Sequence, residues 1–377
     1  MSYWIINYII TIAATTLLAA LLIPKILLIA FRCNLYDAVD DRKIHKGVVP
    51  RLGGVSFLPS IGVALCLIIG VNMRFFGEEM SSSLMGDGVQ LIFLFSSLLL
   101  IYLLGIADDL IGVRYRAKFL FQIVGGILIV LSGLWVRDMF GFLWIHEVAL
   151  WVGWILTVFL VIYVLNAINL IDGIDGLASG LSIVAFAWYS YLFYISGDYI
   201  PMLISGAALG TIIPFFYYNV FGTASAHNKI FMGDTGSLTI GLLLVFLSLK
   251  VDNLPSAPTC GTHEYNLFIL AIAPIIIPCF DVVRVFLHRL RQRRNPFLPD
   301  KSHIHHKLLA LGFAQSKALI TILVWDAILI VLNFMCSLCI GATWLVLADV
   351  ALWTLLNVYL TSAIRRREKM LGEELYK

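Results

Sequence analysis

Two adjacent aspartates, Asp108 and Asp109, stand directly after an apolar run that ends LLGIA. Neighbouring carboxylates at a membrane boundary repel each other, and at least one pKa rises unless a cation lies near them. A bound Mg²⁺ or Lys118 would provide that cation. Lys118 begins the next apolar run, and its long side chain can reach back to an anionic group at the boundary. The alternative is a structural role, in which the aspartates cap the end of the span.

The segment NLIDGIDG spaces Asn169, Asp172 and Asp175 three residues apart, so on a helix they share one face. Its glycines, Gly173 and Gly176, allow a backbone or a ligand to approach closely. An aspartate at membrane level needs a metal, a hydrogen-bond donor or a nucleotide. The spacing therefore indicates a polar site at this boundary.

The segment MGDTGS places Asp234 between glycines, immediately before an apolar helix. The N-terminal amides of such a helix favour phosphate, and a capping role for Asp234 or Thr235 is the simpler alternative. Carboxylate and amide oxygens without cysteine suit a hard cation, Mg²⁺ or Mn²⁺. The chain has no G-x-x-x-x-G-K-[ST] motif, which excludes a P-loop enzyme.

Three histidines, His303, His305 and His306, lie in the segment SHIHHK among many lysines and arginines. A cationic neighbourhood disfavours a second cation and favours a diphosphate. Phosphate recognition is therefore the favoured interpretation. Zinc binding and an ordinary amphipathic helix start are the alternatives.

The elements that position these residues are membrane-spanning helices. Of the 377 residues, 60% are apolar and only 13% are charged, and the mean hydropathy is +0.94, which excludes a soluble enzyme. The apolar runs are too long for barrel strands. The net charge of +3 gives no indication of a nucleic-acid surface. The predicted spans are about eleven, near 5–30, 53–73, 89–107, 118–135, 148–166, 175–195, 200–219, 236–250, 266–288, 317–340 and 342–364.

Basic residues set the predicted orientation, because cytoplasmic loops carry the excess of lysine and arginine. Twenty of the 26 fall in one set of alternate loops or the C-terminal tail, and three fall in the opposite set. With an odd number of spans, the N-terminus is predicted to be outside and the C-terminus cytoplasmic. The outer loops, such as GEEMSSSLMGD, are short, so residues 1–377 are expected to form a single all-α transmembrane domain with its chemistry at the cytoplasmic face.

Five inner segments, read in order, resemble the polyprenyl-phosphate N-acetylhexosamine-1-phosphate transferase superfamily. They are VDDRKIHKGVVPRLGG, GIADDLIGVRYRAKF, NAINLIDGIDGLASG, YNVFGTASAHNKIFMGDTGSL and NPFLPDKSHIHHKLLALG. The last is similar to the branch that transfers N-acetylglucosamine-1-phosphate to undecaprenyl phosphate and so starts a cell-surface polysaccharide. The phospho-MurNAc-pentapeptide transferase branch usually carries a different histidine loop and is the alternative within the superfamily.

The resemblance implies roles for individual residues. Asp108 and Asp109 would serve the lipid phosphate and catalysis, and Lys118 would neutralise that phosphate. Asp234 and Asn169 would bind Mg²⁺, for which Mn²⁺ can substitute. Contacts to the nucleotide or diphosphate are implied for Asp172, Asp175, Asn219, His303, His305 and His306.

The resemblance also implies a bundle of ten or eleven helices around a cytoplasmic cleft in the bacterial inner membrane, often as a homodimer, with UDP-sugar and polyprenyl phosphate as substrates. A broken ninth span is implied, which Pro274 and Pro278 fit.

A secondary transporter is the rival from another class. In that case Asp281, Asp326 and Asp349, which lie within predicted spans, would line a path. The favoured interpretation is that they bond neighbouring helices, or, for Asp281 with Arg284, shape the cleft. A transporter also needs polar residues across the whole membrane depth, whereas here they gather on one side.

Overall fold

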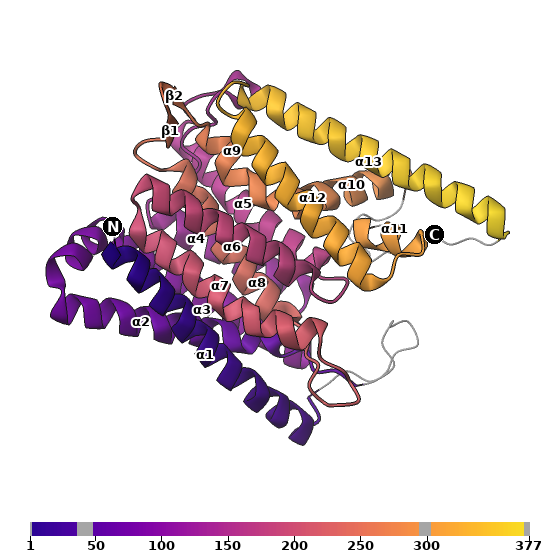
Figure 1. The fold of residues 1–377 in the computed structure, drawn as a ribbon, viewed down its shortest axis with the longest axis horizontal. Helices are drawn as coiled ribbons and strands as arrows, with labels where there is room; N and C mark the ends of the chain where they lie inside the picture. The colour runs from indigo at the N-terminus through magenta and orange to yellow at the C-terminus, as the bar shows by residue number, and fades with distance from the viewer. Residues whose placement is uncertain (1, 36–47, 294–302, 373–377) are drawn as a thin grey trace.

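The computed structural model describes residues 2–35, 48–293 and 303–372, and these form a bundle of long helices (Figure 1). The long helices are α1 (Ser2–Arg32), α2 (Phe57–Phe75), α3 (Gly77–Ile111), α4 (Tyr115–Leu131), α5 (Leu150–Ile171), α6 (Leu177–Ser196), α7 (Tyr199–Val220), α8 (Gly233–Asp252), α10 (Ile276–Arg291), α12 (Gln315–Cys336) and α13 (Ala342–Leu371). The shorter elements are η1 (Gly53–Ser56), η2 (Phe142–Trp144), β1 (Thr259–Cys260), β2 (His263–Glu264), α9 (Leu267–Ile272), η3 (Ala273–Ile275) and α11 (Ile304–Ala310). Among the basic residues used for orientation, Arg42, Lys43, Lys46, Arg294, Lys301 and Lys377 lie outside the described ranges.

The predicted all-α membrane bundle is confirmed, and each of the eleven predicted segments falls on a helix or, for the ninth, on a helix pair. Ten helices of the described chain are long and apolar enough to cross a membrane. The remaining segment, α4, has 17 residues and would rise about 25 Å, slightly less than the hydrocarbon thickness. The start of α1 and the end of α13 lie at opposite ends of the bundle (Figure 1).

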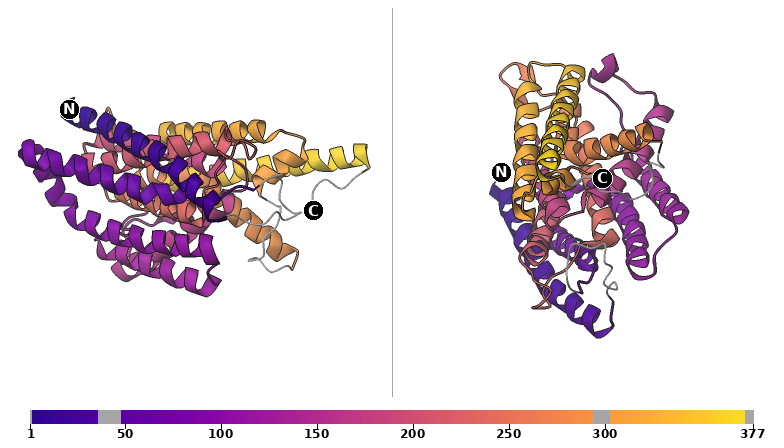
Figure 2. Two further views of the ribbon diagram at one scale, coloured as in Figure 1. Left: turned by 90° about the horizontal axis from the view of Figure 1, so that it is seen from below. Right: turned by 90° about the vertical axis from the view of Figure 1, so that its right-hand side faces the viewer.

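The ninth segment is broken, as the resemblance implies, at Pro274, whereas Pro278 lies within α10. α9 ends at Ile272, η3 contains Pro274, and α10 then begins at Ile276. Proline has no N–H for the helix ladder and clashes with the preceding turn, so the chain changes direction there. Figure 2 shows α10 angled away from its neighbours toward the end of the bundle that carries the C-terminus.

One expected loop is instead helical. The segment GEEMSSSLMGD forms the first turns of α3, which begins at Gly77. Its Asp87 carboxylate lies 2.7 Å from Lys250 Nζ of α8, and Asp198 lies 3.2 Å from the same atom. This buried ammonium group ties α3, α8 and the start of α7 together. The sequence did not predict a helix for this segment, because the ion pairs that hold it join residues that are distant in the sequence.

The centre of the bundle is α8, whose side chains from Thr235 to Asp252 are all buried. It packs against α3 and α5, and small residues allow the close approach. A Cβ atom on Gly105 of α3 would lie 2.4 Å from the Cα atom of Thr235. This contact brings the N-terminus of α8 beside the C-terminal end of α3, where Asp108 and Asp109 lie.

Two of the three membrane aspartates have polar partners among the described residues. Asp281 is buried and accepts a 2.8 Å hydrogen bond from Arg284 Nη2. Asp349 accepts hydrogen bonds from Asn333 Nδ2 and so joins α13 to α12. The carboxylate of Asp326 is buried without a hydrogen-bond partner among the described residues. Two of the three therefore have the helix-bonding or cleft-shaping contacts that the sequence favours.

Candidate active site

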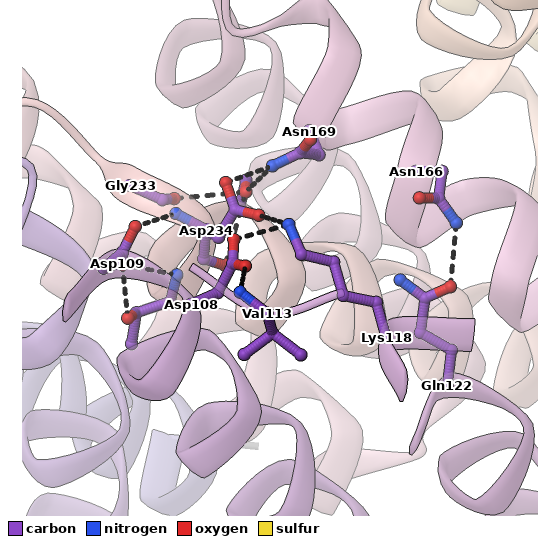
Figure 3. Close-up of polar contacts among 11 residues, drawn as sticks. Asp108, Asp109, Val113, Lys118, Gln122, Asn166, Asn169, Gly233 and Asp234 are labelled. Atoms are coloured by element: carbon purple, nitrogen blue, oxygen red, sulfur yellow. Dashed lines mark hydrogen bonds and ion pairs between the residues drawn. The ribbon is translucent and has the colours of Figure 1, made fainter. Parts of the chain in front are cut away.

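Three charged side chains meet at the ends of α3, α4 and α8 (Figure 3). Lys118 Nζ lies 2.5 Å from Asp108 Oδ2 and 2.7 Å from Asp234 Oδ2. The side chains of Lys118 and Asp234 are 28% and 26% exposed, so substrates can reach them. The ammonium group separates two carboxylates that would otherwise repel each other. The Lys118 ammonium thus lies at the centre of this cluster.

Asp109, next to Asp108, faces a different set of atoms. Its Oδ1 accepts a 2.8 Å hydrogen bond from the backbone N–H of Asp234, and its Oδ2 accepts bonds from the N–H and the hydroxyl of Thr235 at 2.9 and 2.6 Å. Asp109 therefore caps α8 from a neighbouring helix, where a negative charge meets the positive end of the helix dipole. The alternative from the sequence, in which the aspartates cap the end of their own span, does not describe Asp109, which caps α8 instead.

The first position of α8 needs glycine. Gly233 has a φ of +72°, and a Cβ atom there would lie 2.1 Å from the carbonyl oxygen of Arg51 and 2.6 Å from Asp109 Oδ2. The chain around Arg51 is fixed by the bonds from Gly53 N and Gly54 N to the carbonyls of Phe231 and Met232. The first inner segment and the MGDTGS segment thus form one wall of the site.

Asn169 closes the other side of Asp234. Its Nδ2 donates to Asp234 Oδ1 at 3.0 Å and to Ser237 Oγ at 2.9 Å. Three residues earlier on α5, Asn166 Nδ2 donates to Gln122 Oε1 of α4 at 2.9 Å, which fixes α4 one turn after Lys118 (Figure 3). These contacts hold Asn169, Asp234 and Lys118 close together.

The oxygen donors at this cluster suit a hard divalent cation in chemical type. Asp108, Asp234 and the Asn169 amide provide two carboxylates and one amide oxygen, and Mg²⁺ completes such sets with water and substrate phosphates. No group of three or more His, Cys, Asp or Glu that could hold a metal is present among the described residues. A cation would therefore rely on the asparagine, on substrate oxygens and on displacement of the Lys118 ammonium from between the carboxylates.

The NLIDGIDG turn follows α5 directly. The Asp172 side chain has solvent access, and the surrounding protein raises its pKa by displacing water, as do the negative charges of Asp175 and Asp234. Asp175 Oδ2 lies 2.6 Å from Lys229 Nζ, and both side chains are largely buried. Asp172 is thus open to a ligand, whereas Asp175 anchors the loop that carries Lys229.

Asn219 is 5% exposed and links two segments. Its Oδ1 accepts from Gly176 N at 2.6 Å, and its Nδ2 donates to the carbonyl of Ile230 at 2.9 Å. These bonds join the NLIDGIDG turn to the loop before α8. The predicted binding role of Asn219 stays a prediction.

The histidine segment packs against the same turn. His303 Nδ1 lies 2.8 Å from Asp281 Oδ2, and the Ile304 N–H donates to the same carboxylate. The His305 ring is 1% exposed and covers Gly173, where a Cβ atom would meet its Nε2 at 2.1 Å. Burial lowers the pKa of His305 to about 3. The imidazole is therefore neutral here, and the partly buried His306 beside it is the more accessible ring of that pair.

The sequence predicts no role for Ser237 or Lys229, and for Thr235 it offers only an alternative cap. Thr235 and Ser237 donate or accept at Asp109 and Asn169, and Lys229 pairs with Asp175. The D-T-G-S pattern could have indicated the two hydroxyls, because small hydroxyl residues in a first helical turn commonly bond backbone or neighbouring groups. No local pattern identifies the partner of Lys229, which is 54 residues away.

Comparison with known proteins places this geometry in a family. The family described as "Glycosyl transferase family 4" matches residues 91–252. The undecaprenyl-phosphate alpha-N-acetylglucosaminyl 1-phosphate transferase of Yersinia pestis is 32% identical over 304 residues, which are 80% of this chain and 76% of that protein. The chain belongs to glycosyl transferase family 4. The probable undecaprenyl-phosphate N-acetylglucosaminyl 1-phosphate transferase of Bacillus subtilis is 29% identical over 322 residues, covering 84% of this chain and 81% of that protein.

The segment matched to glycosyl transferase family 4 contains the whole charged cluster, from Asp108 to Asp234. The histidine segment lies beyond it in sequence, and the contact between His305 and Gly173 brings it back to the family's core segment. The resemblance to the polyprenyl-phosphate transferase superfamily is thereby confirmed. The roles of individual site residues stay predictions that this geometry makes specific.

Proposed function

We propose that this chain transfers N-acetylglucosamine-1-phosphate from UDP-N-acetylglucosamine to undecaprenyl phosphate, with release of UMP. The observation that carries the proposal is the Lys118 ammonium held between Asp108 and Asp234, in a membrane protein of glycosyl transferase family 4. Relatives at 29 to 32% identity bear the name of this activity. The product would be a lipid-linked diphosphate sugar.

The chemistry requires two anions to meet. A lipid phosphate oxygen attacks the β-phosphorus of the UDP-sugar, the bond to the UMP oxygen breaks, and UMP leaves with that electron pair. Because a phosphate monoester is already anionic near neutral pH, little proton abstraction is needed. Two unit charges about 4 Å apart repel by roughly 4 kcal/mol at an effective dielectric constant of 20. Positive charge at the reacting atoms is therefore the main requirement.

Lys118 meets that requirement from the protein side. Its side chain is 28% exposed, and among the described residues its ammonium group pairs with two carboxylates that are themselves candidate ligands. When a phosphate enters, the lysine can exchange one carboxylate for a phosphate oxygen without losing its charge partner. Asp109 keeps the α8 N-terminus, and hence Asp234, in place during this exchange.

Mg²⁺ is the proposed cofactor, with Mn²⁺ as a substitute. Asp234, Asn169 and Asp108 would hold it, and when bound it would neutralise the diphosphate and stabilise the charge that develops during transfer. Among the nucleotide-binding candidates, the exposed Asp172 and the partly buried His306 would contact the donor. Asp175, Asn219, His303 and His305 would position the loops that carry those contacts.

The proposed location and orientation of the chain in the membrane follow from the UDP-sugar donor. UDP-sugars are cytoplasmic, so the charged cluster would face the cytoplasm from the bacterial inner membrane, in agreement with the basic loops. A homodimer stays a prediction.

The sugar is tested with a panel of donors. Membranes that contain the chain are incubated with undecaprenyl phosphate and one of three donors, UDP-GlcNAc, UDP-GalNAc or UDP-MurNAc-pentapeptide. The lipid products are then identified by mass spectrometry. We expect the GlcNAc diphosphate lipid to dominate. Preference for the MurNAc-pentapeptide donor would assign the chain to the other branch, and no lipid product with any donor would favour the transporter.

A further inference from the structure

The histidine segment reaches the candidate site on a helix that is too short to be stable alone. α11 has seven residues, Ile304–Ala310, whereas isolated helices shorter than about 12–15 residues are marginal in water. On one face, His305 covers Gly173 of the NLIDGIDG turn. α11 also packs against α12 and α13 (Figure 1). The position of the histidines therefore depends on the contacts that α11 makes away from the turn.

Lys307 attaches the middle of α11 to α13. Two residues along a helix rotate a side chain by about 200°, so Lys307 lies on the face opposite His305. Its Nζ donates to Asn357 Oδ1 at 3.0 Å and to Thr361 Oγ at 3.1 Å. Lys307 is 5% exposed and Asn357 is 6% exposed, and within the described chain the ammonium group bonds no carboxylate. A buried charge with only neutral acceptors is destabilised when one acceptor is lost.

A second contact holds the end of α11. Arg367 of α13 donates from Nη1 to the carbonyl oxygen of Ala310, the last residue of α11, at 3.2 Å. A cation at this position stabilises a helix, because the last carbonyl groups lack partners within the helix and carry partial negative charge. The chain then turns at Gly312, which has a φ of +84° and lies against the Arg367 guanidinium. The middle and the end of α11 are thus attached to the same helix.

α13 is fixed separately at its other end. Thr343 Oγ donates to the carbonyl oxygen of Gly141 at 2.9 Å and accepts from the N–H of Leu143 at 2.7 Å. Thr343 and Thr361 are about 27 Å apart along the helix at 1.5 Å per residue. The attachment of α13 to the bundle can therefore be perturbed at either end without changing the other.

We propose that α13 positions the histidine segment for the UDP-sugar donor, with Asn357, Thr361 and Arg367 as positioning residues that act through α11. Their contacts keep the histidines against the turn that carries Asp172. When the contacts are lost, α11 moves away from the turn and the donor binds more weakly. The inference rests on the proposed function for the identity of the donor.

The lipid acceptor should be affected less than the donor. Lys118, Asp108 and Asp234, which would receive the lipid phosphate, belong to α4, α3 and α8. α11 packs mainly against α12 and α13. A positioning role therefore predicts weaker binding of the donor without an equal change for the acceptor, whereas a general loss of stability would affect both.

The test measures the dissociation constant of UDP-GlcNAc for the purified full-length chain by isothermal titration calorimetry, without acceptor. Asn357→Leu removes the acceptor oxygen of Lys307, and we expect it to weaken binding about tenfold or more. Asn357→Asp keeps an oxygen at this position, and its binding should stay within about threefold of the wild type. The KM for undecaprenyl phosphate, at saturating UDP-GlcNAc, should be similar in all three chains.

Two matched substitutions locate the effect on α13. Thr361→Val removes the hydroxyl that accepts from Lys307, and Thr343→Val removes the hydroxyl at the far end of the same helix. We expect Thr361→Val to weaken UDP-GlcNAc binding by about threefold or more and Thr343→Val to leave it unchanged. Hydrogen exchange of the backbone amides of residues 304–310 should accelerate in Asn357→Leu and Thr361→Val, and should stay at the wild-type rate in Thr343→Val.

The inference is overturned if Thr361→Val and Thr343→Val change donor binding equally, or if exchange in residues 304–310 is the same in every chain. It is also overturned if Asn357→Leu folds and binds UDP-GlcNAc as the wild type does. If Asn357→Leu does not fold, the pair of threonine variants decides. A wild type that shows the expected binding pattern but releases no UMP in the presence of acceptor would overturn the proposed function and leave this inference standing.

Discussion

Asp109 Oδ2 accepts hydrogen bonds from both the backbone N–H and the hydroxyl of Thr235, at 2.9 and 2.6 Å. One carboxylate on α3 thus fixes the first turn of α8, the helix that carries Asp234. The adjacent Asp108 has a different partner, the Lys118 ammonium. Two neighbouring aspartates therefore have different contacts: Asp109 positions α8, and Asp108 holds the Lys118 ammonium.

Asp109→Asn should lower both transfer activity and stability. The variant removes a charge at a helix N-terminus and replaces an acceptor oxygen by an amide donor, for which we expect a loss of about 1–2 kcal/mol. Thermal unfolding in detergent measures this loss. Thr235→Val removes only the hydroxyl and should cost less. An Asp109→Asn chain with wild-type stability and wild-type activity would show that the cap is dispensable.

Lys118→Ala should reduce transfer by at least about a hundredfold. It leaves Asp108 and Asp234 facing each other without a cation, so one carboxyl should become protonated, and the lipid phosphate loses its partner. Initial rates at varied lipid concentration measure the change. Arg116→Ala is the control, because Arg116 is exposed two residues away and bonds only the neighbouring Tyr115 ring hydroxyl in the described contacts. Equal rates for both variants would remove Lys118 from the mechanism.

Removal of the divalent metal by a chelator should abolish activity. EDTA is expected to abolish transfer, and added Mg²⁺ or Mn²⁺ should restore it, because oxygen donors select hard cations. Binding of Mn²⁺, followed by electron paramagnetic resonance, should weaken about tenfold or more in Asp234→Asn, whose membrane expression should be normal. Asp87→Asn, at the other end of the bundle, should leave Mn²⁺ affinity unchanged. Full activity after stringent chelation would exclude the metal.

The topology can be tested with fusions. A reporter that works only in the cytoplasm should be active after Lys377, because the described Arg365, Arg366 and Arg367 belong to the large basic set. A reporter that works only in the periplasm should be inactive at the same position. The reverse pattern would put Asp234 on the side without UDP-sugars and contradict the proposed function.

Much of the fold could be predicted because it depends on local features of the sequence. Apolar length determined the helices, and Pro274 marked the break between α9 and α10. The separate tasks of Asp108 and Asp109 could not be predicted, because they depend on how α3 is rotated against α8 at the contact between Gly105 and Thr235. Nor could the two hydrogen bonds of Asn219 be predicted, since its partners Gly176 and Ile230 meet only in the folded chain.

The released nucleotide tests the central claim most directly. Purified chain is incubated with UDP-GlcNAc and undecaprenyl phosphate, and the nucleotides are separated and quantified beside the lipid product. Attack on the β-phosphorus predicts UMP in equal amount to a lipid-linked diphosphate sugar, and neither product from Asp234→Asn. Attack on the sugar carbon would release UDP and give a lipid monophosphate sugar. Recovery of UDP in place of UMP would contradict the account.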